Sequence, residues 1–119
     1  MPCNKVAGKS FGKKWTQAFI LLLLSEKPSH GYDIAKRLVD FGCPKKNIAQ
    51  MGGLYRNLSE LENDGYVLSD WDTDDNGPAK KIYRISPDGI VYLKTLSEYF
   101  DGIIEILADF QNRIAKLDI

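Results

Sequence analysis

The sequence predicts a mainly α (α+β) protein of winged helix-turn-helix architecture that ends in a long helix for dimerisation. Three helical patterns come first, two alternating segments around a turn-rich stretch follow, and a long helical pattern closes the chain. With 119 residues the chain is long enough for one core. We therefore divide it into a basic flexible arm over residues 1–14, a winged-helix domain over 15–86 and a dimerisation helix over 87–119.

Three helical segments separated by helix-breaking residues make up the first half. The apolar stretch from Trp15 to Leu24 ends shortly before Pro28, which predicts the end of a first helix. We expect Ser29 to cap a second helix, whose apolar residues recur at helical spacing until Gly42. A third helix is expected from about residue 49 to residue 63, so three helices precede any strand.

Two strands and a final helix are predicted for the second half. Residues 66–71 and 80–85 alternate apolar with polar side chains, and residues 72–78 between them are rich in Asp, Asn, Gly and Pro. This pattern predicts a β-hairpin, the wing of the fold. Ser86-Pro87-Asp88 then supplies a cap, a proline at the first helical position and an early acid, so a fourth helix begins there and can run to the end.

The charge of the chain is polarised although its sum is zero. Residues 1–56 carry ten Lys and Arg against three acids, or +7, and residues 57–119 carry six against thirteen, or −7. Such asymmetry suits a first half that meets the phosphates of nucleic acid. The longest apolar run, Ala18–Leu24, is far shorter than the roughly 20 residues that span a bilayer, and no secretion signal is evident. We therefore expect a cytoplasmic protein that does not bind membranes.

Catalytic and metal-binding patterns are missing from the sequence. His30 is the single histidine, and together with Cys3 and Cys43 it gives no metal-ligand spacing. Nothing resembles a catalytic triad or a pair of catalytic carboxylates. We expect no metal, no cofactor and no enzymatic activity, and we interpret His30 as a capping or packing residue.

Four sequence pieces follow one another in order and at compatible spacing: Leu22-Leu23-Leu24 followed by His30-Gly31-Tyr32-Asp33-Ile34, then Gly53-Leu54-Tyr55-Arg56-Asn57-Leu58, then Leu61-Glu62-Asn63-Asp64-Gly65-Tyr66-Val67, and Gly77-Pro78-Ala79-Lys80-Lys81-Ile82-Tyr83-Arg84-Ile85. Together they resemble PadR-type transcriptional regulators over roughly residues 18–93. The resemblance implies a dimeric transcriptional repressor, often released from DNA by small aromatic or lipophilic ligands.

Two details refine this resemblance. Asp40-Phe41-Gly42 and Trp71-Asp72-Thr73, with Gly77-Pro78-Ala79-Lys80, are similar to the subgroup of poly-β-hydroxybutyrate-responsive repressors. In contrast, Gln50-Met51-Gly52-Gly53 stands where family members often have a Ser-Pro-Gly-Thr-like cap. Contacts made by a hydroxyl there cannot be carried over to this chain.

The third helix is expected to lie in the major groove of double-stranded DNA. Bidentate groups distinguish base edges there, so Gln50 suits adenine and Arg56 suits guanine. A solvated Arg56 is an equal alternative. Gly53 lets the backbone approach a phosphate. Tyr55 can donate a hydrogen bond from its hydroxyl to a phosphate, or it can pack in the core. The predicted DNA contacts, including those of the preceding turn and of the wing, are Lys45, Lys46, Asn47, Gln50, Gly53, Tyr55, Arg56, Lys80 and Lys81. The acids Asp72, Asp74 and Asp75 count against a wing tip that enters a groove deeply.

The last helix carries apolar residues at alternating spacings of three and four, the pattern of a heptad seam. A helix of about 31 residues is roughly 46 Å long and exceeds the width of so small a domain, so part of it should meet a second copy. The predicted interface is Leu93, Leu96, Phe100, Ile103, Leu107, Phe110, Ile114 and Leu117. Aromatic residues near it could line an effector pocket or simply pack in the core: Trp15, Tyr92, Tyr99 and Phe100.

Two alternative functions remain open from the sequence. A winged-helix module can serve as a protein-interaction adaptor, in which case the basic half is a solvated surface. A thiol-based redox sensor would use Cys43, which lies next to lysines in a turn.

Overall fold

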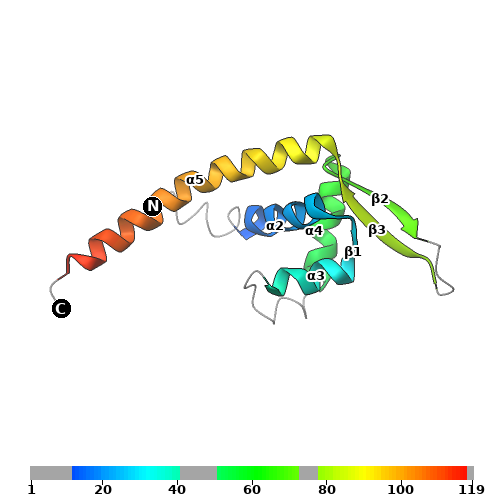
Figure 1. Ribbon diagram of the computed structural model, residues 1–119, viewed down its shortest axis with the longest axis horizontal. Helices are drawn as coiled ribbons and strands as arrows, with labels where there is room; N and C mark the ends of the chain where they lie inside the picture. The colour runs from blue at the N-terminus through cyan, green and yellow to red at the C-terminus, as the bar shows by residue number, and fades with distance from the viewer. Residues whose placement is uncertain (1–11, 41–50, 73–77, 118–119) are drawn as a thin grey trace.

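Helices and strands follow one another in the predicted order, with one additional short strand (Figure 1). The computed structural model describes residues 12–40, 51–72 and 78–117. The elements are α2 (Gly12–Glu26), β1 (Ser29–His30), α3 (Gly31–Asp40), α4 (Met51–Asn63), β2 (Val67–Asp72), β3 (Lys80–Ile85) and α5 (Pro87–Ala115). This arrangement of helices, hairpin and long final helix confirms the predicted winged-helix fold class.

The strands form one antiparallel sheet in the order β1-β3-β2. In the hairpin Val67 pairs with Ile85 and Asp72 with Lys80, as expected for a wing. Ser29, predicted as a helix cap, instead lies in β1 opposite Tyr83, so this prediction was wrong. A strand of two residues is too short for a period-2 pattern, and its pairing with β3 depends on the tertiary fold.

The first helix begins earlier than predicted. Lys13 and Lys14, assigned to the basic arm, lie in the first turn of α2. The ammonium group of Lys13 is 3.0 Å from the Glu60 carboxylate of α4, which fixes this end of α2 against the third helix. Residues 1–11 of the predicted arm lie outside the described residues.

The core is built around α2, which is apolar on most of its circumference. Ile20 and Leu21 are fully buried, and Leu23 and Leu24 nearly so. A helix with apolar residues all round must be covered on several sides, and α2 packs against α3, α4, α5 and β3. The other helices and the hairpin contribute Ile34, Ala35, Leu54, Leu58, Leu61, Val67, Tyr83 and Leu96.

The start of α5 is fastened to the turn between α4 and β2. Ser86 is the N-cap: its Oγ accepts a hydrogen bond from the Gly89 amide at 3.0 Å and donates one to the Gly65 carbonyl at 2.6 Å. A Cβ at Gly89 would collide with the carbonyl oxygen of Tyr66, so only glycine permits this close approach. The long helix therefore leaves the domain in a fixed direction.

Helix α5 has 29 residues and is about 43 Å long at 1.5 Å per residue. Its first half lies over α2, and its second half projects beyond the rest of the domain, away from the hairpin (Figure 1). The whole measures 64 × 29 × 23 Å. Among the described residues, no helix is long and apolar enough to cross a membrane.

Candidate nucleic-acid interface

Helix α4 has one buried and one exposed face. Leu54, Leu58 and Leu61 are buried in the core, whereas Arg56 is exposed and Tyr55 is 42% exposed. Arg56 has no ion-pair partner in the described part of the chain. Its guanidinium group is thus available to a ligand, as a base-reading or phosphate-binding arginine requires.

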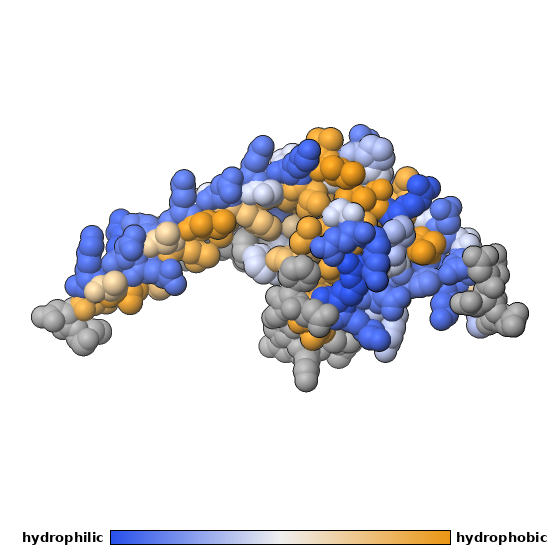
Figure 2. All heavy atoms as spheres, viewed as in Figure 1, coloured by the Kyte–Doolittle hydropathy of each residue, from blue (hydrophilic) through white to orange (hydrophobic). Residues whose placement is uncertain are grey.

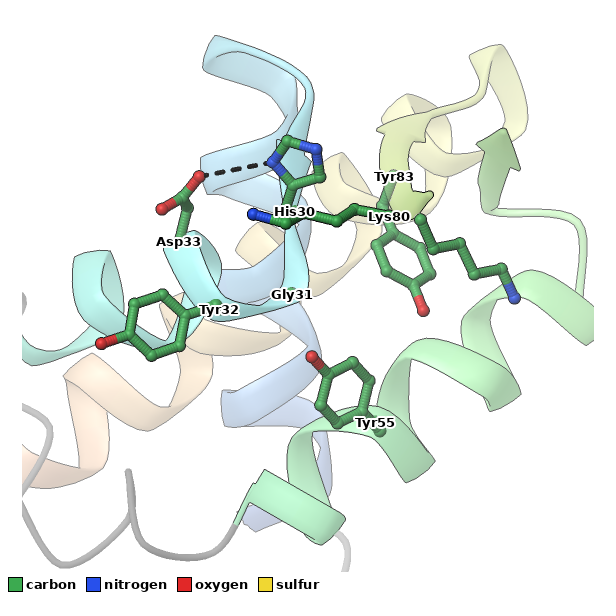
Figure 3. A pocket seen from close by; sticks show the side chains of 8 residues that line it. His30, Gly31, Tyr32, Asp33, Tyr55, Lys80 and Tyr83 are labelled. Atoms are coloured by element: carbon green, nitrogen blue, oxygen red, sulfur yellow. Dashed lines mark ion pairs between the residues drawn. The ribbon is translucent and has the colours of Figure 1, made fainter. Parts of the chain in front are cut away.

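A cleft of about 340 Å³ opens where α4, the start of α3 and strand β3 meet (Figure 3). In Figure 3 the rings of Tyr55 and Tyr83 reach into this space from different elements, whereas the ring of Tyr32 points away from it. The cleft is lined by His30, Gly31, Tyr32, Asp33, Tyr55, Lys80, Lys81 and Tyr83. It brings together three of the predicted DNA contacts, Tyr55 of α4 and the two lysines of the wing.

The two lysines of the cleft differ in their surroundings. The ammonium group of Lys81 is 3.4 Å from the Glu62 carboxylate and 5.6 Å from the centroid of the Tyr83 ring. Lys80 is exposed and forms no ion pair with any described residue. Lys80 is therefore the cation of the cleft that an anionic ligand can engage without displacing a carboxylate.

The hydroxyl of Tyr83 keeps its proton at neutral pH and can therefore donate a hydrogen bond. The residue is 5% exposed, and burial raises its pKa above the ordinary value, although the charge of Lys81 works in the opposite direction. The phenol therefore remains protonated at neutral pH. The cleft thus holds hydrogen-bond donors for a phosphate oxygen, from the hydroxyls of Tyr55 and Tyr83 and the ammonium group of Lys80.

His30 connects the start of α3 with the wing. Its Nε2 is 3.2 Å from Oδ2 of Asp72, and its Nδ1 is 3.6 Å from Oδ2 of Asp33 (Figure 3 shows the latter pair). Diagonally across the hairpin, Oδ2 of Asp70 lies 3.5 Å from Nε of Arg84. Of the three wing acids that count against deep entry into a groove, Asp72 is thus paired with His30, and Asp74 and Asp75 lie outside the described residues.

Several predicted contact residues cannot be placed in this interface. Lys45, Lys46, Asn47 and Gln50 lie outside the described residues. Gly53 lies in the first turn of α4, where a Cβ would meet nothing within 4 Å. The described fold therefore does not itself require glycine at this position.

Two residues of α3 belong to this surface but were not predicted. Tyr32 is 63% exposed, and the Lys36 ammonium lies 5.4 Å from the centroid of its ring. Their spacing of four residues places both on one face of the helix. Tyr32 is one of the apolar residues that give α3 its helical pattern, yet the alternation of exposed and buried residues places it on the exposed face of the helix.

The predicted effector residues separate into two groups. Trp15 lies 5.8 Å from Phe100 and 4.7 Å from Phe19, and Phe100 lies 5.7 Å from Tyr99, measured between ring centroids. These four rings form one aromatic cluster, and Tyr92 is part of a different contact.

Tyr92 stacks on Tyr66 at 4.3 Å with an interplanar angle of 11°, and its hydroxyl is 3.5 Å from the buried Gln17 side chain. The amide nitrogen of Gln17 is in turn 3.3 Å from both Asn57 and Glu60 of α4. Tyr92 is therefore part of a polar link between α5 and α4 instead of the aromatic cluster around Trp15.

The predicted dimer seam on α5 also lies in two environments. Leu96 is 2% exposed, and Leu93 and Phe100 are partly buried against the same core, because α2 covers the first half of α5. Leu96 thus belongs to the chain's own core, which corrects its assignment to the dimer interface. Beyond the half-buried Ile103, the seam residues are 51–61% exposed: Leu107, Phe110, Ile114 and Leu117.

Figure 2 shows the apolar residues of the projecting helix gathered along one side, with hydrophilic residues along the opposite edge. Ile104 and Ile106 widen this surface and are 61% and 51% exposed. An exposed apolar face of this length on a single subunit is typical of a protein-protein interface.

A sequence model of the PadR-like family of transcriptional regulators matches residues 20–95. This range includes the core, the cleft, the wing and the first third of α5. No curated protein sequence matches the chain.

Solved structures similar to this chain include TM0937, described as a conserved protein of unknown function and a potential transcriptional factor. It is 40% identical, with 86% of this chain and 89% of that chain covered and a TM-score of 0.73. A transcriptional regulator from Clostridium thermocellum is 26% identical, covers 86% of this chain and 98% of its own, and has a TM-score of 0.70. A PadR-like transcription factor from Bacteroides fragilis shares the fold at 24% identity, with 87% and 97% covered and a TM-score of 0.69.

Proposed function

Because the chain belongs to the PadR-like family of transcriptional regulators, we propose that it is a cytoplasmic, homodimeric repressor of a palindromic operator, released by a small aromatic or lipophilic effector. The observation that supports this best is the cleft, where Tyr55 of α4 and Lys80 of the wing line one space. These are the two elements of a winged helix that must reach DNA together.

In the proposed complex α4 lies in the major groove. Arg56 contacts a guanine edge, and Gln50, which precedes α4 in the sequence, contacts adenine. Gly53 lets the backbone approach a phosphate. Tyr55 and Lys80 contact phosphates on the flanking strand, and Lys81 adds a partly neutralised charge. Further phosphates are contacted by the residues that precede α4 in the sequence, Lys45, Lys46 and Asn47.

Two copies would associate through the projecting half of α5. The half-buried Ile103 and the exposed apolar side chains from Ile104 to Leu117 supply apolar surface, and each Leu, Ile or Phe contributes about 1.5–3 kcal/mol when fully buried. Paired helices would hold two α4 helices about 34 Å apart, the repeat of successive major-groove faces. A two-fold symmetric protein of this kind matches a palindromic site.

The effector is proposed to bind where Trp15, Tyr99 and Phe100 lie close together, beside the exposed part of α5. Trp15 is 41% exposed, so a flat apolar molecule can stack on it. A ligand placed between α2 and the partner's helix would change the angle between the two subunits. The resemblance to poly-β-hydroxybutyrate-responsive repressors gives one class of lipophilic candidate.

Titration of a fluorescein-labelled duplex from the DNA upstream of its own gene tests this function. Tight binding that weakens steeply with salt, and exceeds the affinity for a random duplex of equal length by at least about 10³-fold, is the expected result. Equal affinity for both duplexes would favour the protein-interaction adaptor instead. Sedimentation of the same sample at micromolar concentration should show a dimer. Cys43, on which the redox alternative depends, lies outside the described residues.

A further inference from the structure

Trp71 is the most exposed tryptophan of the protein. It lies next to the last residue of β2, and 65% of its surface is exposed, against 41% for Trp15. A tryptophan seldom remains so exposed without a partner, because its ring is largely apolar and its indole N–H seeks an acceptor. Neither the core nor the proposed dimer helix accounts for its position on the wing.

The register of the hairpin determines the face on which Trp71 lies. Side chains of directly paired residues share one face of a sheet, and Trp71 pairs with Lys81 as Ser69 pairs with Tyr83. Ser69 and Lys81 both contact Glu62 of α4. These four residues therefore form the inner face of the hairpin, which we define as the face toward α4.

The acids of the hairpin are on the other side. The carboxylate of Asp70 forms an ion pair with Arg84, and that of Asp72 lies 3.2 Å from the His30 ring. Alternation along β2 places both acids on the outer face. The wing thus keeps its described carboxylates away from the inner face. That face presents an aromatic ring beside a lysine.

Trp71 lies across the strand pair from one of the residues that line the cleft. Lys81 and Tyr83 line the cleft and belong to the inner face, and Trp71 lies directly across from Lys81 at the outer end of the strand pair. A flat apolar ring with one N–H donor, placed beside Lys81, matches a sugar-phosphate backbone. The ring can cover a deoxyribose while the N–H donates to a phosphate oxygen.

We infer that Trp71 is a DNA-contacting residue of the wing, whose indole packs on the sugar-phosphate strand beside the groove that α4 occupies. This inference rests on the proposed DNA-binding function. The contact is to backbone and not to base edges, so it strengthens binding to every sequence alike.

A fluorine label on both tryptophans tests the contact. The full-length protein is labelled with 5-fluorotryptophan, and Trp71→Phe identifies the resonance of Trp71 in the ¹⁹F spectrum. The free protein should show a solvent isotope shift (H₂O against D₂O) for Trp71 that disappears when the duplex saturates the protein. Trp15 provides the internal reference.

Affinity measurements add an independent readout. Trp71→Ala should weaken binding to the upstream duplex and to a random duplex by about the same factor, roughly tenfold. Leu68→Ala is the matched control, since Leu68 is an apolar residue of the same strand on the outer face, and its DNA affinity should equal that of the unmodified protein.

Two results would overturn the inference while leaving the proposed function intact. One is an isotope shift of Trp71 that persists in a complex shown by anisotropy to be saturated. The other is an indole already shielded in the free dimer, which would mean that a second copy covers it. Failure to bind any duplex would instead contradict the proposed function itself.

Discussion

The ring of Tyr55 lies directly against the backbone of Gly31. A Cβ added at Gly31 would be 2.6 Å from Cε1 and 2.7 Å from the hydroxyl oxygen of Tyr55. A Cβ atom does not come this close to a non-bonded atom, so the absence of a side chain at the start of α3 makes room for the Tyr55 ring between the two helices. The donor that α4 contributes to the cleft is therefore positioned by a glycine on another helix.

Gly31→Ala should displace the Tyr55 ring and lower the free energy of unfolding by about 1–3 kcal/mol, the usual cost of overpacking. Urea unfolding at fixed protein concentration measures this. Gly102→Ala is the control: it lies exposed within α5, its Cβ would meet nothing within 4 Å, and it should stabilise by about 0.5–1 kcal/mol. If both alanine variants raise the free energy of unfolding equally, the position of the Tyr55 ring does not depend on the missing side chain at Gly31.

Arg56→Ala should weaken binding to the specific duplex by about 1–3 kcal/mol and leave binding to random DNA nearly unchanged. The physical reason is that the guanidinium of Arg56, free of ion pairs in the described structure, would contact a base edge. Anisotropy titrations with both duplexes measure the difference. An equal loss on both duplexes would assign Arg56 to a phosphate.

Lys80→Ala should weaken binding to all sequences alike and reduce the slope of log affinity against log salt by about one. Lys81→Ala should have the smaller effect, because the Glu62 carboxylate 3.4 Å away already neutralises part of its charge. The two adjacent lysines thus serve as controls for each other in one salt titration. Identical slopes for both variants would contradict the difference inferred from their ion pairing.

The hairpin and the length of α5 could be predicted because their signals are local. Alternating residues around an Asp-, Asn- and Gly-rich stretch give the wing, and Ser86-Pro87-Asp88 gives the start of the last helix. Strand β1 could not be predicted, since its two residues become a strand only through their pairing with β3. The beginning of α2 likewise depends on a tertiary contact, the ion pair between Lys13 and Glu60.

The residue types of the candidate site could be predicted from the sequence, but the neighbours that cover or neutralise each residue could not. Leu96 and Leu107 occupy the same heptad pattern, yet one is 2% and the other 56% exposed. Periodicity defines a face of a helix and does not say whether the chain's own core or a second copy covers it. The difference between Lys80 and Lys81 depends in the same way on Glu62, which is distant in sequence.

Ionisation of two tyrosines should destabilise the protein at alkaline pH. Burial raises the pKa of Tyr83 and of Tyr92 above the ordinary value of 10.0. The unfolded chain then releases protons before the folded chain does, so stability is unaffected at neutral pH and falls as the pH rises past about 10. Absorbance titration of the phenolates should show a late-titrating fraction that shrinks in Tyr83→Phe; an unchanged titration would contradict the burial.

The projecting half of α5 offers the sharpest test of assembly. Phe110 is 61% exposed in the single subunit, so Phe110→Glu should convert the dimer to monomer while each subunit stays folded, because a charge buried in an apolar seam is costly. Sedimentation velocity and far-UV circular dichroism measure the two properties separately. Asn112→Glu adds the same charge on the hydrophilic edge of the helix and should leave the dimer intact.

Leu96→Ala should show the opposite behaviour on the same helix. Leu96 is buried in the core of its own subunit, so its truncation should lower the free energy of unfolding by about 2–5 kcal/mol without selectively abolishing dimerisation. A folded, stable monomer from Leu96→Ala would mean that the seam begins in the first half of α5. A dimer that persists in Phe110→Glu would place the interface elsewhere on the molecule.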